Sequence, residues 1–308
     1  MKIKLVISFI IFLFIFATPV SAAPPHCSCG EDRWLKLQNP LMFGQDVHEI
    51  QSQLKNMGYY QGAINGLYDK NTVQAVKEFQ QKEGLQADGI FGPKTFNKLA
   101  ELFEKPVSNL DTEKPQGEVS IVIYTLEREM VVMDDGKPFK RFPVAVGKFK
   151  TPTPIGLFTI TQKDAWGEGF GSRWMRLSVP WGIYGIHGTN KPWSIGAFES
   201  GGCIRMHNTH VEQVYEWVQV GTKVFLIGGV DGPFTFGLNP LTQGSKGSDV
   251  MEVQKRLAGY GFYDGAYDGN YGQQTQQAVK AFQKAKGLNV TGNVDEATYE
   301  ALGIQLFE

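Results

Sequence analysis

The 308-residue sequence has only one long apolar run, which lies at its beginning. Lys2 and Lys4 precede the apolar residues 5–16, and the small residues 20–22 follow them, an order typical of a secretory signal peptide. The run is short for a membrane span of about 20 residues, although an uncleaved anchor stays open as an alternative. No later stretch is apolar enough to span. We therefore expect residues 1–22 to be removed and the mature chain to be exported to the cell wall or the extracellular space.

An excess of positive charge is also missing. The chain has 30 basic and 31 acidic side chains, and removal of residues 1–22 leaves 28 against 31, a net charge of −3. Nucleic-acid-binding proteins show a basic patch or stripe, so this balance argues against a nucleic-acid partner. The composition, 42% hydrophobic and 12% aromatic, is that of an ordinary globular protein with about two to three domains.

Cysteine is scarce, with three residues in the whole chain. An odd number in an exported protein leaves a thiol that is free or paired with another chain. Cys27 and Cys29 stand near the new amino terminus, and Cys203 stands alone. Cys203 is therefore the candidate free thiol.

The chain repeats itself at an offset of 203 residues, with the copies at 44–103 and 240–305. Apolar residues at helical spacing predict three short helices in each copy. Asp46 and Asp249 are predicted N-caps, and Tyr60 and Tyr263 are expected to be exposed. The copies resemble the type-1 peptidoglycan-binding domain in their opening G-x-D-V-x-x-x-Q-x-x-L and their ending F-Q-x-x-x-G-L. That resemblance implies binding to the wall polymer, and simple spacers remain the alternative.

A mostly β domain is predicted at 118–228, after a polar linker at 104–117. Runs rich in β-branched residues at 119–124 and 130–133 predict strands, with a hairpin turn at 134–137, and 224–227 is expected to close the sheet. Within this domain, His187 is followed after fifteen residues by Cys203. A thiol becomes a nucleophile as thiolate, and a neighbouring imidazole assists this and then protonates the leaving group. The amides of Gly202 and Cys203 are candidates for an oxyanion hole.

Three strings carry a more specific signal, namely the residues at 151–158, 187–196 and 200–206. Together they resemble the L,D-transpeptidase (YkuD-like) catalytic domain, which implies a β-sandwich with one or more helices between the two repeats. By that resemblance Cys203 is the nucleophile, His187 is the base and the Gly188 carbonyl orients the imidazole. Ser200 and Arg205 occupy further motif positions, which we assign to substrate binding. Many members carry a histidine where this chain has Gly201.

The resemblance implies a transpeptidase that joins peptidoglycan stem peptides through a thioester and needs no metal or other cofactor. An L,D-carboxypeptidase would use the same nucleophile with water as acceptor, and a non-catalytic wall-binding or coat protein is the rival without an enzyme. A papain-like protease is disfavoured because its cysteine precedes its histidine. A zinc site would draw on four side chains, namely His187, Cys203, His207 and His210.

Overall fold

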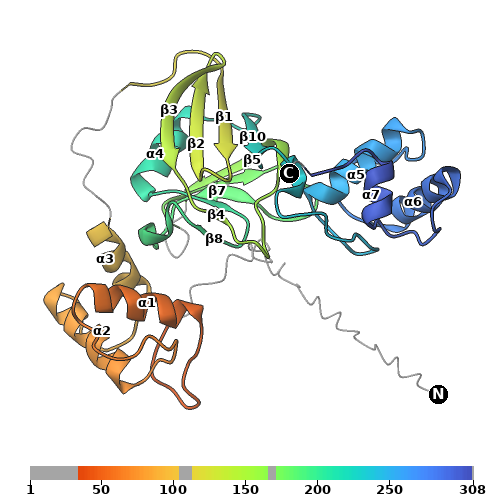
Figure 1. The fold of residues 1–308 in the computed structure, drawn as a ribbon. Helices are drawn as coiled ribbons and strands as arrows, with labels where there is room; N and C mark the ends of the chain where they lie inside the picture. The colour runs from red at the N-terminus through yellow and green to blue at the C-terminus, as the bar shows by residue number, and fades with distance from the viewer. Residues whose placement is uncertain (1–33, 104–112, 166–170, 307–308) are drawn as a thin grey trace, which may run out of the picture.

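The computed structural model describes residues 34–103, 113–165 and 171–306 (Figure 1). The predicted signal peptide, Cys27, Cys29 and most of the predicted linker lie outside the described residues. Within them, no helix has the length and apolar character needed to cross a bilayer.

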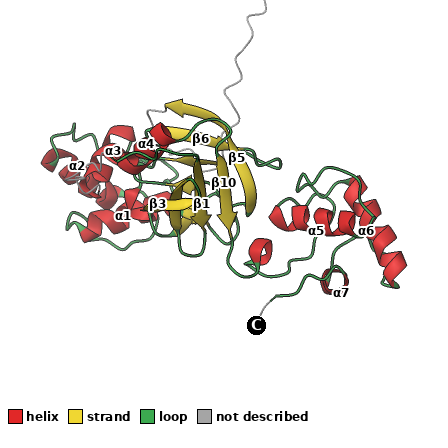
Figure 2. Cartoon of the chain, turned by 90° about the horizontal axis from the view of Figure 1, so that it is seen from above, coloured by secondary structure: helices red, strands yellow, loops and turns green. Residues whose placement is uncertain are grey.

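The two repeats fold into small helical domains on opposite sides of a central sheet domain (Figures 1 and 2). The first repeat contains α1 (Gln45–Asn56), α2 (Lys70–Lys82) and α3 (Pro93–Phe103). The second contains α5 (Ser248–Gly259), α6 (Gln273–Lys286) and α7 (Glu296–Ala301). The prediction of three helices in each copy is confirmed.

A buried glutamine explains why both repeats carry glutamine at the same position of their shared pattern. Gln51 is fully buried; its side-chain amide donates to the Leu67 carbonyl and to Thr72 Oγ1, both at 2.9 Å, and its Oε1 accepts from the Gly66 amide at 2.9 Å. Gln254 makes the equivalent bonds in the second repeat. The side chain closes the loop between the first two helices, and its loss would leave several buried polar groups unsatisfied.

Two details of the repeats differ from the sequence prediction. Gly44 and Gly247 are the N-caps, so Asp46 and Asp249 lie two residues after the caps, in the first turn, where a negative charge faces the positive end of the helix dipole. The tyrosine prediction is also wrong. Tyr60 and Tyr263 are buried, because each hydroxyl bonds the glutamine amide and a loop carbonyl.

The central domain is mostly β, as predicted. Its strands are β1 (Val119–Tyr124), β2 (Glu129–Asp134), β3 (Lys137–Pro143), β4 (Val146–Gly147), β5 (Gly156–Ala165), β6 (Arg173–Leu177), β7 (Gly185–His187), β8 (Phe198–Ser200), β9 (Ile204–Arg205) and β10 (Lys223–Ile227). Eight of them form one sheet in the order β3-β2-β1-β10-β5-β6-β7-β9, and β4 pairs with β8. Asp135 and Gly136, both with positive φ, make the predicted hairpin turn.

The expectation that residues 224–227 close the sheet is wrong, because β10 lies in its middle. It pairs parallel to β1 and antiparallel to β5. Two parallel neighbouring strands cannot be joined by a tight turn, so the rest of the domain lies between β1 and β10 in the sequence.

One core unites the two ends of the curled sheet. Its buried side chains come from β1 to β7, from β9 and β10, and from α4 (Asn208–Trp217), whose Val211 and Val214 face inward. The predicted sandwich is therefore made by a single sheet curling over its own core. This arrangement fixes β7 and β9, which carry the candidate site.

Both repeats pack against the central domain. Lys191 pairs with Glu49 of the first repeat at 3.2 Å, and Trp193 packs edge-on against Phe103 with ring centroids 5.5 Å apart. On the other side, Met251 of the second repeat joins the central core. The first repeat thus rests on the segment that links His187 to Cys203.

Candidate active site

His187 is the last residue of β7, between β6 and β9 in the sheet. Its backbone is in register with Trp174 on one side and Arg205 on the other, and its carbonyl accepts from the Met206 amide at 2.9 Å. The ring is buried, 5.7 Å from the Trp174 ring. The sheet therefore holds the imidazole rigidly.

The imidazole is oriented by the residue that follows it. Nδ1 of His187 lies 2.6 Å from the Gly188 carbonyl oxygen. A carbonyl can only accept, so Nδ1 carries the proton and Nε2 is the basic nitrogen. This is the contact expected of Gly188.

Cys203 comes directly before β9, which runs parallel to β7 with Ile204 opposite Ile186. Side chains alternate along a strand, so Cys203 shares the face of Arg205, two residues on, and of its register partner His187. Cys203 is fully buried and in the reduced form. The pairing of two short strands thus brings together residues that are sixteen positions apart.

Ser200 holds the loop that presents Cys203. Its buried hydroxyl donates to the Cys203 carbonyl at 2.5 Å and accepts from the Gly202 amide at 3.0 Å. Its proton and one of its two lone pairs are used within the loop, which gives Ser200 a positioning role, and its assignment to substrate binding stays a prediction. The Gly202 amide is likewise engaged and cannot also face an oxyanion, which leaves the Cys203 amide as the predicted donor.

Gly202 is required where it stands. Its φ is +114°, and a Cβ there would lie 2.7 Å from Cε1 of Tyr184. Tyr184 was not singled out from the sequence, because an aromatic residue before a strand resembles any core residue. Its ring covers the nucleophile loop.

Arg205 lies on β9 and is half-buried. Its backbone makes both bonds of a bridge to Ala145, and its guanidinium forms no ion pair with the residues that the structure describes. The assignment of Arg205 to a substrate carboxylate stays a prediction.

Asn208 is a site residue that sequence reasoning missed. Its Oδ1 accepts from the Ser172 amide and its Nδ2 donates to the Thr189 carbonyl, each at 3.0 Å. A Cβ on Gly188 would lie 2.2 Å from Oδ1, so the amide packs directly on the turn that orients His187. An asparagine at the first residue of a helix looks like a cap, which concealed this role.

His207 and His210 lie edge to face with ring centroids 5.3 Å apart. Burial lowers the pKa of both, and burial together with the charges of His207 and Lys140 lowers the pKa of His210 to about 4. Among the described residues, no three histidine, cysteine or acidic side chains gather as a metal site would require. The four-residue zinc alternative is therefore not supported.

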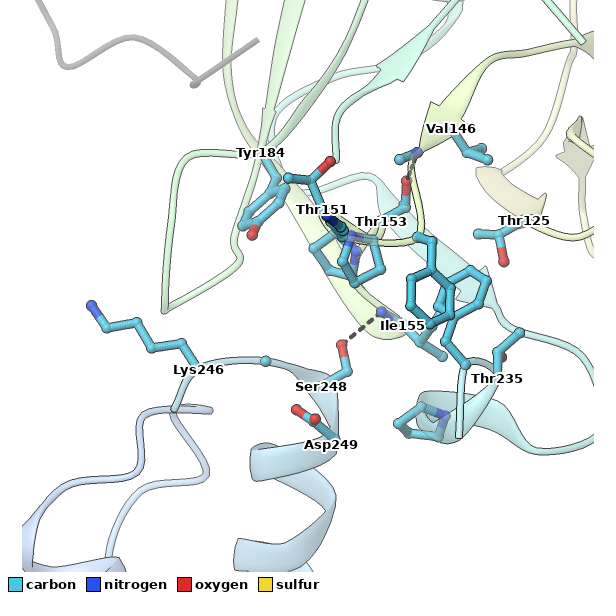
Figure 3. Close-up of a pocket in the computed structure, with 18 of the residues that line it drawn as sticks. Thr125, Val146, Thr151, Thr153, Ile155, Tyr184, Thr235, Lys246, Ser248 and Asp249 are labelled. Carbon is cyan, nitrogen blue, oxygen red and sulfur yellow. Dashed lines mark hydrogen bonds between the residues drawn. The ribbon is translucent and has the colours of Figure 1, made fainter. Parts of the chain in front are cut away.

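A cavity of about 410 Å³ opens beside the nucleophile loop (Figure 3). The residues that line it include Gly201 and Tyr184, the threonine- and proline-rich loop at 151–155, and residues 246–249 of the second repeat. The Thr151 hydroxyl donates to the Ser200 carbonyl at 3.1 Å, which joins this side to the loop of Cys203. Such a cavity suits a peptide better than a flat surface would.

The comparisons with known proteins match all three domains. The L,D-transpeptidase catalytic domain (YkuD) matches residues 118–226, and the peptidoglycan-binding domain matches residues 43–99 and 246–302. A Bacillus subtilis (strain 168) protein named as an L,D-transpeptidase, YqjB, is 33% identical over 39% of this chain and 78% of its own length. The chain belongs to the L,D-transpeptidase family.

Another Bacillus subtilis protein named as an L,D-transpeptidase, YkuD, is 46% identical over 29% of this chain and 54% of its own length. The chain thus spans about half of that relative. A solved L,D-transpeptidase from Mycobacterium smegmatis is 26% identical over 35% of this chain and 58% of that one, with a TM-score of 0.32.

Proposed function

We propose that the protein is an exported cysteine L,D-transpeptidase that cross-links peptidoglycan stem peptides. The observation that carries the proposal is the His187 imidazole, held by the Gly188 carbonyl with Nε2 as its basic nitrogen, on the strand next to the loop of Cys203. A fixed tautomer beside a thiol is what a general base needs.

In the first step the Cys203 thiolate attacks the carbonyl of the bond between the third residue of a donor stem and its terminal D-alanine. The Sγ–C bond forms, the C–N bond breaks, and the imidazolium of His187 protonates the departing amine. The Cys203 amide stabilises the oxyanion. The product is a thioester, and its formation consumes no other reagent.

In the second step the amine of an acceptor stem attacks the thioester carbonyl. His187 takes the proton from that nitrogen, the new amide bond forms, and the Sγ–C bond breaks to restore the thiolate. Water in place of the amine would give the carboxypeptidase product. The two outcomes differ in mass, since only transfer joins two stems.

Binding of the polymer by the repeats belongs to the same proposal. Both repeats match the peptidoglycan-binding domain, and a module that holds the polymer raises the local concentration of stems. Export to the wall, expected from residues 1–22, places the enzyme beside this substrate.

The test is incubation of the mature protein with disaccharide tetrapeptide, with the products read by mass spectrometry. We expect a cross-linked dimer, a thioester adduct on the wild-type protein and neither with Cys203→Ala. His187→Gln should slow acylation by about 10²–10⁴-fold. Adducts that persist in Cys203→Ala would refute the assignment of the nucleophile.

A further inference from the structure

The cavity beside the nucleophile loop belongs to two domains. Tyr184 and Gly201 come from the central domain, whereas Lys246, Ser248 and Asp249 come from the second repeat (Figure 3). A module that only anchored the protein to the wall would not need to supply side chains to this cavity.

The junction that forms the cavity is tightly packed. The Ser248 hydroxyl lies 2.7 Å from the Ile155 amide, which donates to it. Trp181 packs so closely on Gly269 that a Cβ there would lie 2.3 Å from Cε3 of the indole. Met251 adds its side chain to the central core. The second repeat is therefore a fixed wall of the cavity.

Asp249 is the only acidic side chain among the described residues that line this cavity. It is half-buried, and its Oδ1 accepts a hydrogen bond from the Val250 amide at 2.8 Å. No cationic side chain in the described ranges pairs with it. Burial raises the pKa of this carboxyl, which shows that the charged form lacks full solvation. A cation bound in the cavity would stabilise the charged carboxylate and so replace the solvation that burial removes.

We propose that this cavity binds the amine-bearing acceptor peptide and that Asp249 of the second repeat recognises its ammonium group. The inference rests on the proposed function, which requires a second substrate with a free amine. Asp249 binds that nitrogen in its protonated form as the peptide enters. The ammonium first loses one proton to solvent to become the attacking amine, and His187 takes the second proton in the transfer step. Lys150 and Lys246, at the same cavity, suit the carboxylates of a stem peptide.

The chain supplies a matched control for Asp249. Asp46 stands at the same position of the first repeat, in the first turn of α1, and accepts from the Val47 amide at 2.9 Å. It does not line the cavity. An asparagine at either position keeps the oxygen that accepts from the amide and removes the charge.

The experiment measures binding and transfer separately, with the full chain throughout. In a Cys203→Ala background, calorimetry compares a stem peptide carrying Nε,Nε-dimethyllysine, which is cationic but forms no stable amide, with one carrying Nε-acetyllysine, which is neutral. We expect about tenfold tighter binding of the cationic peptide. Asp249→Asn should abolish this preference, and Asp46→Asn should preserve it.

In the active protein, Asp249→Asn should lower the ratio of transfer to hydrolysis about tenfold, and Asp46→Asn should leave it unchanged. Equal effects of the two substitutions, or an unchanged preference in Asp249→Asn, would overturn the inference. Failure of the wild type to form a thioester would instead refute the proposed function, while the binding arm would still decide the role of Asp249. Thermal unfolding of both variants checks that each is folded.

Discussion

Asn208→Ala tests whether the orientation of His187 depends on the clamp behind it. The substitution removes two hydrogen bonds, one to the Ser172 amide and one to the Thr189 carbonyl, each at 3.0 Å. The Thr189 residue is buried, so the loss leaves a backbone group without solvent to replace its partner. Taking roughly 1–3 kcal/mol for each of the two groups left unsatisfied, we expect a loss of about 2–6 kcal/mol in the free energy of unfolding.

The rate of Cys203 acylation should fall by more than the loss of folding stability explains. The turn that Asn208 holds carries the Gly188 carbonyl, and displacement of a catalytic group by about 1 Å costs on the order of 10²-fold in rate. The assay follows acylation of Cys203 by a carbapenem with intact-mass analysis, at temperatures where the variant is fully folded. Val132→Ala, in the buried part of β2 far along the sheet, serves as a destabilised control with about 2 kcal/mol of loss. Acylation equal to that of the control would show that Asn208 only stabilises the fold.

Three further predictions concern the domains. Gln254→Ala, and likewise Gln51→Ala in the first repeat, should lower the free energy of unfolding measured by calorimetry by about 3 kcal/mol. A loss below about 1 kcal/mol would show that the hydrogen bonds of these glutamines do not stabilise the repeats. The pKa values of His207 and His210 are lowered in the folded protein, so as the pH falls the unfolded chain binds protons before the folded chain does. The free energy of unfolding should therefore be at its full value above about pH 6.5 and fall by about 1–2 kcal/mol towards pH 4. His210→Phe should flatten that profile in denaturant titrations. Trp193→Ala should loosen the first repeat, giving it a separate calorimetric transition, whereas a single unchanged transition would show that this contact is not needed for docking.

The sequence predicts well whatever follows from periodicity. Apolar residues at helical spacing gave the helices of both repeats, because the same stripe that recurs along the chain is the one that packs inward. The hairpin at Asp135 and Gly136 was predicted for the same kind of local reason, since only a few residue types tolerate positive φ.

Contacts made at long range are what the sequence conceals. The place of β10 in the middle of the sheet depends on its pairing with β1, about a hundred residues away. Ser200 is a motif position that looks exposed on a glycine-rich loop, yet the loop folds over its hydroxyl, which donates one hydrogen bond and accepts another within the loop. The clamp of Asn208 on Ser172 spans 36 residues and has no local signature.

The two repeats show how one pattern can serve two purposes. Their core positions match at the constant offset, so both fold alike, but positions on their surfaces differ. His48 of the first repeat is exposed, whereas its counterpart Met251 enters the core of the central domain. An apolar residue at a position that the helix period assigns to solvent therefore marks the copy that docks at the site, because such a residue gains stability only when another surface covers it.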